Sequence, residues 1–138
     1  MALRTVLLSL MAFGVARAAF AQTSKPAAEP RYDPANVVSL MGTATEVRDV
    51  PRASPLSGVH VVLRTDKGTI EVYLAPASFL KEMGVAYGRG DQIYVIGSRV
   101  KLGDNFIILA REVRKENSVV YLRDESGNPN WPAEKDKT

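Results

Sequence analysis

Residues 58–74 read GVHVVLRTDKGTIEVYL, and this stretch is the most regular part of the sequence. Apolar and polar side chains alternate in both halves, and Asp66-Lys67-Gly68 between them is a typical hairpin turn. The pattern predicts two antiparallel strands, 58–65 and 69–74, whose successive side chains point to opposite faces. The face predicted to enter the core consists of Val59, Val61, Leu63, Ile70, Val72 and Leu74. The opposite, outer face consists of His60, Val62, Arg64, Glu71 and Tyr73.

A short helix is predicted directly after this hairpin, over residues 76–83. Pro76 suits the first helical position, and Gly84 suits the position after the helix end. The apolar side of this helix is predicted to hold Phe79, Leu80 and Met83.

Three further strands are predicted around the hairpin and the helix. The first, 37–47, contains Gly42, where a bulge or a sharp bend is expected. Residues 91–100 and 106–113 follow the helix, and 119–123 is a further extended piece. An SH3-like barrel is the main alternative, but it normally has no helix between its third and fourth strands. The predicted fold class is therefore all-β, a small five-stranded OB-fold barrel with a short helix between strands 3 and 4.

The first 21 residues have the pattern of a secretory signal peptide. Arg4 precedes a mostly apolar run, 5–16, and Ala19-Phe20-Ala21 supplies small residues around a cleavage point after Ala21. The run is too short to span a bilayer, which needs about 20 apolar residues. We therefore expect a periplasmic or secreted protein with no transmembrane segment.

The remaining chain divides into three parts. Residues 22–36 are rich in Pro, Ala and polar residues and are predicted to be a flexible lead-in. The OB-fold domain is predicted over 37–123, and a polar C-terminal tail over 124–138. Trp131 in this tail is expected to pack back on the barrel.

The charge of the chain is nearly balanced once the signal peptide is set aside. The sequence has 18 Lys+Arg and 15 Asp+Glu, and removal of Arg4 and Arg17 leaves 16 basic residues. A nucleic-acid partner therefore gains little support from charge, since a basic stripe would be needed. The chain has no Cys and one His, which excludes disulfides and argues against zinc, haem and iron–sulfur sites. We expect no cofactor and no metal.

Several short motifs carry a family resemblance. A Gly-containing first strand, Gly68-Thr-Ile-Glu-Val72 and Gly90-Asp91 together resemble the periplasmic bacterial OB-fold family, over residues 37–113. A longer pattern is similar to exported bacterial OB-fold proteins of unassigned function. It consists of Ala75-Pro-Ala-Ser-Phe-Leu80, Gly90-Asp91, Gly97-Ser-Arg-Val100, Ala110-Arg-Glu-Val113 and Leu122-Arg-Asp124 with Pro129 and Trp131. Both resemblances imply the OB-fold and export from the cytoplasm.

We place the candidate binding site on the outer face of the hairpin, because strands 2 and 3 carry the usual binding platform of OB-folds. Its residues are His60, Val62, Arg64, Glu71 and Tyr73. His60 is expected to be solvated beside a cross-strand Arg64–Glu71 pair. One aromatic, one aliphatic and opposed charges suit a protein, a peptide or a small ligand. Tyr73→Ala and Arg64→Ala are expected to leave the fold stable while weakening binding.

No catalytic constellation accompanies this face. A Ser–His–acid triad would have to use His60, and no nucleophile lies in a G-x-S-x-G elbow. The predicted function is that of a non-enzymatic exported binding or accessory protein, monomeric or weakly associated. The alternative is a single-stranded nucleic-acid-binding protein, in which aromatic side chains stack on bases and basic ones meet phosphates. The side chains available for this are Tyr73, Tyr94, Arg64, Arg99, Lys101 and Arg111.

Overall fold

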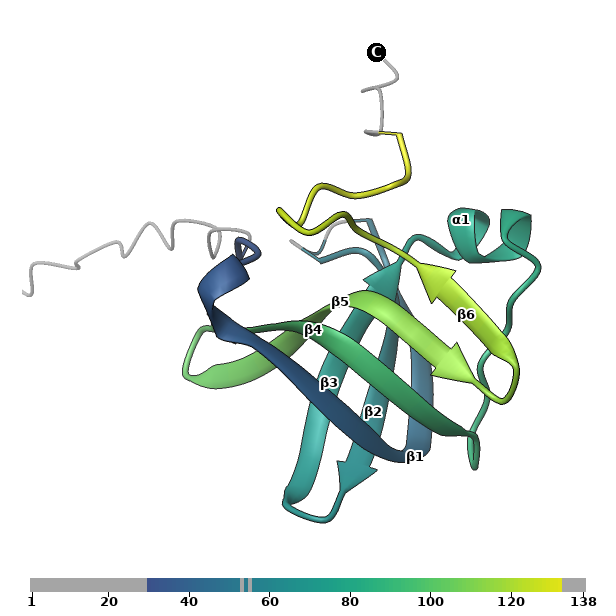
Figure 1. Cartoon of the computed structure of the whole chain (residues 1–138), viewed down its shortest axis with the longest axis horizontal. Coiled ribbons are helices and arrows are strands. Elements are labelled where there is room, and N and C mark those ends of the chain that lie inside the picture. Colours follow the sequence, from purple (N-terminus) through teal and green to yellow (C-terminus); the bar gives the residue numbers. More distant parts are fainter. Residues whose placement is uncertain (1–29, 53, 55, 133–138) are drawn as a thin grey trace, which may run out of the picture.

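The computed structural model describes residues 30–52, 54 and 56–132, and these form an all-β domain with one short α-helix and a 3-10 turn (Figure 1). The elements in chain order are η1 (Pro34–Asn36), β1 (Val37–Val50), β2 (Gly58–Thr65), β3 (Gly68–Ala75), α1 (Ala77–Glu82), β4 (Gln92–Leu102), β5 (Asn105–Lys115) and β6 (Ser118–Tyr121). The sheet order is β3-β2-β1-β4-β5-β6, and β3 also pairs in parallel with β5. This pairing closes β1 to β5 into a barrel, so the predicted OB-fold is confirmed.

β1 belongs to both halves of the barrel. Its residues 37–43 pair with β4, and its residues 43–50 pair with β2. Gly42 lies where these pairings meet, and a Cβ there would overlap the carbonyl oxygen of Arg64. The bulge itself lies two residues further on, between Ala44 and Glu46. Gly42 is therefore needed for close approach of two backbones rather than for a bulge.

The β2–β3 hairpin has the predicted faces. Val61, Leu63, Val72 and Leu74 are completely buried in the main core, and Ile70 packs against it. The turn between the strands is Asp66-Lys67, and Gly68 follows with a φ of 123°, a conformation that L-residues rarely adopt.

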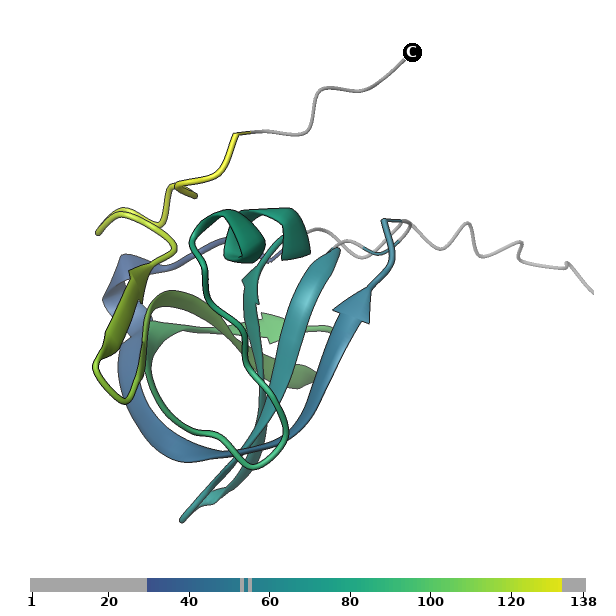
Figure 2. The ribbon, with the colours of Figure 1, turned by 90° about the vertical axis from the view of Figure 1, so that its right-hand side faces the viewer.

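The helix α1 covers one end of the barrel, as Figure 2 shows. Phe79 and Leu80 are buried against the main core, whereas Met83, which was expected on the same face of the helix, is 49% exposed. Met83 is the C-cap of a helix that ends at Glu82, and Pro76 is the N-cap rather than the first helical residue. Among the described residues no helix is long and apolar enough to cross a membrane.

A second, smaller core lies outside the barrel, over the seam between β3 and β5. Its buried residues are Leu56, Tyr73, Ile107 and Leu109. Tyr32 and Trp131, which come from opposite ends of the described chain, pack against it. The expected return of Trp131 to the barrel is therefore confirmed.

The residues flanking the barrel are attached to it by specific contacts. Within the described part of the predicted lead-in, the Asp33 N–H donates to Ser98 Oγ at 2.9 Å, and Ser98 Oγ donates to the Asp33 carbonyl at 2.8 Å. Gly127 lies so close to the Tyr32 ring that a Cβ would overlap it. The lead-in and the tail thus meet each other on the barrel surface.

Candidate functional site

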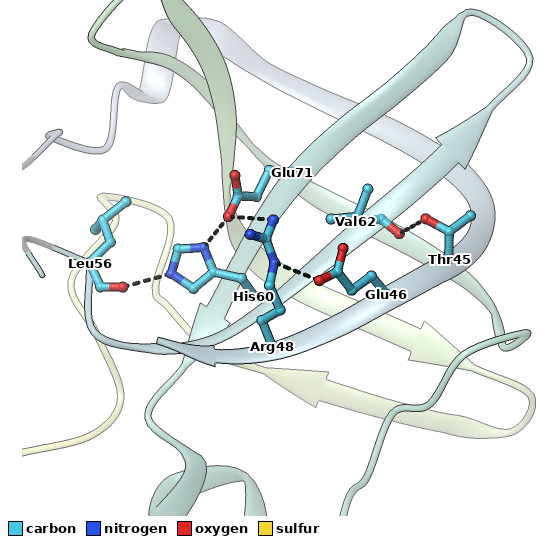
Figure 3. Close-up of polar contacts among 7 residues, drawn as sticks. All are labelled: Thr45, Glu46, Arg48, Leu56, His60, Val62 and Glu71. Atoms are coloured by element: carbon cyan, nitrogen blue, oxygen red, sulfur yellow. Dashed lines mark hydrogen bonds and ion pairs between the residues drawn. The ribbon is translucent and has the colours of Figure 1, made fainter. Parts of the chain in front are cut away.

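A polar network lies on the outer side of β1, β2 and β3 (Figure 3). Glu71 Oε1 is 2.8 Å from His60 Nδ1 and 3.6 Å from Arg48 Nη2. Arg48 Nε is in turn 3.3 Å from Glu46 Oε1. The expected Arg64–Glu71 pair is wrong, because the strand register places Arg64 opposite Thr69 and Glu71 opposite Val62. Arg48 could not be predicted from the sequence pattern, since its place beside Glu71 depends on how β1 pairs with β2.

His60 is the centre of this network and is buried, not solvated as expected. Its side chain is 4% exposed, and its Nε2 lies 2.6 Å from the Leu56 carbonyl oxygen. Both partners of the ring, a carbonyl and a carboxylate, accept hydrogen bonds. A neutral imidazole has one N–H and can satisfy only one of them, whereas the doubly protonated ring donates to both. Through these two contacts the ring joins the β1–β2 loop to β3.

Tyr73 is also buried, whereas the expectation that Tyr73→Ala leaves the fold stable assumed an exposed side chain, so this variant is now expected to destabilise the domain. Its hydroxyl donates to the Ser57 carbonyl at 3.1 Å, and its ring meets Trp131 edge-on at a centroid distance of 6.4 Å. His60 lies against the same ring, at 5.1 Å. The physical reason is long-range packing, since Leu56 and Trp131 cover this part of the hairpin from segments without strand periodicity.

The predicted binding face is thereby divided into a covered part and an open part. His60 and Tyr73 lie in the covered part, while Arg64 is exposed and Val62 and Glu71 are half-buried. The open part is small and polar. Binding by its three residues stays a prediction.

The network offers little for catalysis or metal binding. Both ring nitrogens of His60 already have partners. Within residues 30–52, 54 and 56–132, no group of three or more His, Asp or Glu side chains could hold a metal ion.

A second outer surface extends over β1, β4, β5 and β6, and sequence reasoning missed it. Its side chains come from β1, β4, β5 and β6, in two adjacent cross-strand rows given by the strand pairings. One row is Met41, Tyr94, Arg114 and Val119, and the other is Ser39, Ile96, Glu112 and Tyr121. We call these eight residues the β6-side face.

The β6-side face is mostly apolar at its edges and carries an ion pair near its centre. Met41 is 68% exposed, Tyr121 61% and Val119 43%. Arg114 Nη2 lies 2.7 Å from Glu112 Oε1, and this contact raises the pKa of the arginine. The alternation of apolar and polar residues in β5 and β6 could have indicated which of their side chains point outward. The position of Met41 beside them could not be predicted, because it depends on the pairing of β1 with β4.

The loop between α1 and β4 is fastened beside this face. The Asp91 carboxylate accepts from Lys115 Nζ at 2.9 Å and from the Gly88 N–H at 2.7 Å. These hydrogen bonds, that of Lys115 first, hold the pKa of Asp91 below its ordinary value. Burial raises the pKa of the neighbouring Tyr87 phenol to about 12.

A closed barrel of β1 to β5, with α1 between β3 and β4, defines the chain as a small OB-fold protein. The model of the MamS/MamX magnetosome protein family matches residues 36–120, which include every strand of this barrel. The match covers more than half of the chain, and the chain belongs to this family. No curated protein matches it.

Proposed function

We propose that this chain is an exported, non-enzymatic accessory protein that binds a partner protein through the β6-side face. The observation that carries the proposal is the exposure of Met41, Val119 and Tyr121 on one continuous sheet surface. Large apolar side chains that are exposed together on one sheet face, around a polar centre, are typical of protein interaction sites. The family is described as one of magnetosome proteins, so we propose another magnetosome protein as the partner.

Composition of the face supports a protein partner. Tyrosine and methionine are enriched in interfaces, and a tyrosine with an open ring can serve as an anchor. The Arg114–Glu112 pair leaves the centre of the face without net charge. A polyanion would find no excess of cations there.

A binding role without catalysis is supported by the state of His60. It is the only histidine of the sequence, it is buried, and both of its nitrogens are engaged in holding the β1–β2 loop. A general base needs a nitrogen within reach of a substrate proton.

Export is supported by the leader pattern of residues 1–21, which lie outside the described residues. Mass spectrometry of the protein from its native host is expected to show an N-terminus at Gln22. An intact Met1 in soluble, exported material would contradict this part of the proposal.

The binding face is tested by photocrosslinking in the native host. A photoreactive amino acid at Tyr121 is expected to give one specific protein adduct. The same group at exposed Asp104 is expected to give none, because Asp104 lies in the β4–β5 turn, at the other end of β5 from Glu112, the pairing partner of Tyr121. Met41→Glu in the Tyr121 variant should abolish the adduct while leaving the melting temperature unchanged, since Met41 is largely exposed. Equal adducts from both positions, or an adduct that survives Met41→Glu, would refute the proposal.

Single-stranded nucleic-acid binding is the second candidate function, and one observation favours it. The Arg99 guanidinium stacks over the exposed Phe106 ring at 3.7 Å from its centroid, and Lys101 lies 5.7 Å from the same centroid. Cations beside an open aromatic ring are what single-strand binding requires. Fluorescence anisotropy with a thymidine oligonucleotide would show affinity that falls steeply with salt if this function holds.

A further inference from the structure

The end of the barrel opposite α1 is open and hollow. α1 follows the C-terminal end of β3, whereas the hollow lies at its N-terminal end, beside the β2–β3 turn at the bottom of Figure 1. The hollow measures about 390 Å³, within the range of roughly 300–1,000 Å³ that is usual for ligand sites. Barrel mouths are among the preferred places for such sites.

The floor of this hollow is apolar. Val38 and Leu40 of β1 and Ile70 of β3 are partly buried and pack against the main core, and Ile108 of β5 is completely buried. The turn beside it is braced, because Thr65 Oγ accepts from the Lys67 N–H at 3.2 Å and donates to the Gly68 carbonyl at 2.9 Å. The hollow is therefore preformed and suits an apolar chain.

The rim of the hollow is cationic. Arg99 and Lys67 are exposed on it, and among the described residues neither forms an ion pair with a carboxylate. Stacking on Phe106 holds the Arg99 guanidinium in place while its N–H edge stays able to bind an anion. A second hollow, of about 320 Å³, lies against Arg99 and Phe106 and shares Val38 with the first.

We propose that this barrel mouth binds a small amphipathic anion, a carboxylate on an apolar chain. The carboxylate pairs with Arg99 in the bidentate geometry that guanidinium favours, with Lys67 nearby, and the chain lies on Leu40 and Ile70. An inorganic anion would leave the apolar floor exposed to water, and a neutral apolar molecule would form no ion pair with Arg99 or Lys67. Asp66, in the β2–β3 turn beside the mouth, disfavours a long polyanion.

The test is isothermal titration calorimetry of the purified protein with octanoate. Octanoate is expected to bind, and each methylene removed from the chain should weaken binding by up to about fourfold. Arg99→Gln should weaken octanoate binding by about tenfold or more, because it removes a charge-assisted hydrogen-bonding pair. Lys81→Gln on α1, at the opposite end of the barrel, is the matched control and should bind as the wild type does.

Three ligand controls separate the possible sources of binding. Octanol has the hydrocarbon chain of octanoate without its charge, and acetate has the charge without the long hydrocarbon chain. A thymidine oligonucleotide tests binding of a polyanion. The proposal is overturned if octanoate does not bind at millimolar concentration, if acetate binds as tightly, or if Lys81→Gln weakens binding as much as Arg99→Gln. Arg99-dependent oligonucleotide binding without octanoate binding would assign the rim to nucleic acid instead.

Discussion

Replacement of Tyr73 by alanine should destabilise the domain strongly. The ring is 6% exposed and packs with Leu56, Ile107 and Leu109 outside the β3–β5 seam. Truncation of a buried aromatic ring generally costs about 3–5 kcal/mol, because apolar contact is lost and a cavity remains. Tyr73→Phe keeps the ring and removes the hydrogen bond to Ser57, so about 0.5–1.5 kcal/mol is expected for that variant.

Urea unfolding followed by tryptophan fluorescence measures these differences. Trp131 is the only tryptophan and lies edge-on to Tyr73, so its emission also reports the docking of the tail. Arg64→Ala is the control, since Arg64 is exposed on the same strand pair and should change the free energy of unfolding by no more than about 0.5 kcal/mol. If Tyr73→Ala were as stable as Arg64→Ala, the second core described above would not exist.

Three further predictions concern the core and two titratable groups. Val61→Asp buries an unpaired charge and should destabilise the domain by on the order of 3–5 kcal/mol in the same urea assay. Val62→Asp is the control and should have a much smaller effect, because Val62 is half-buried on the outer face. An absorbance titration should show the Tyr87 phenol ionising near pH 12, and this step should vanish in Tyr87→Phe. Because the pKa of the phenol is raised from 10.0 in the folded state, the stability that this phenol contributes is present below pH 10 and is lost as pH rises through 12. Asp91→Asn should be less stable than the wild type at neutral pH, and the difference should shrink below about pH 3.8, because a lowered folded pKa contributes stability only above the unfolded pKa. An equal difference at pH 7 and pH 3 would show that the hydrogen bond from Lys115 does not depend on the charge of Asp91.

Local pattern was sufficient to predict the barrel. Strict alternation in residues 58–74 assigned the buried side chains of β2 and β3, and the helix between strands 3 and 4 identified the OB-fold. Both signals depend on neighbours in sequence. Both signals can therefore be recognised without knowledge of the tertiary structure.

The outer surface could not be predicted in the same way. Alternation correctly pointed His60 and Tyr73 away from the barrel interior, but it did not reveal that Leu56 and Trp131 cover them. The covering residues come from a loop and a tail that carry no periodic signal. Likewise, the partner of Glu71 is Arg48, and only the register of β1 against β2 brings the two together.

The seam between β3 and β5 has a consequence for the order of folding. The β2–β3 and β4–β5 pairs are local hairpins, whereas the parallel seam joins strands separated by α1 and β4 and contains only three residue pairs. Local contacts form faster than distant ones, because less chain entropy is lost before they are made. Closure of the ring is therefore a late kinetic event. Tyr32, Leu56 and Trp131 pack over the seam, so the segments outside the barrel stabilise the closed ring once it has formed.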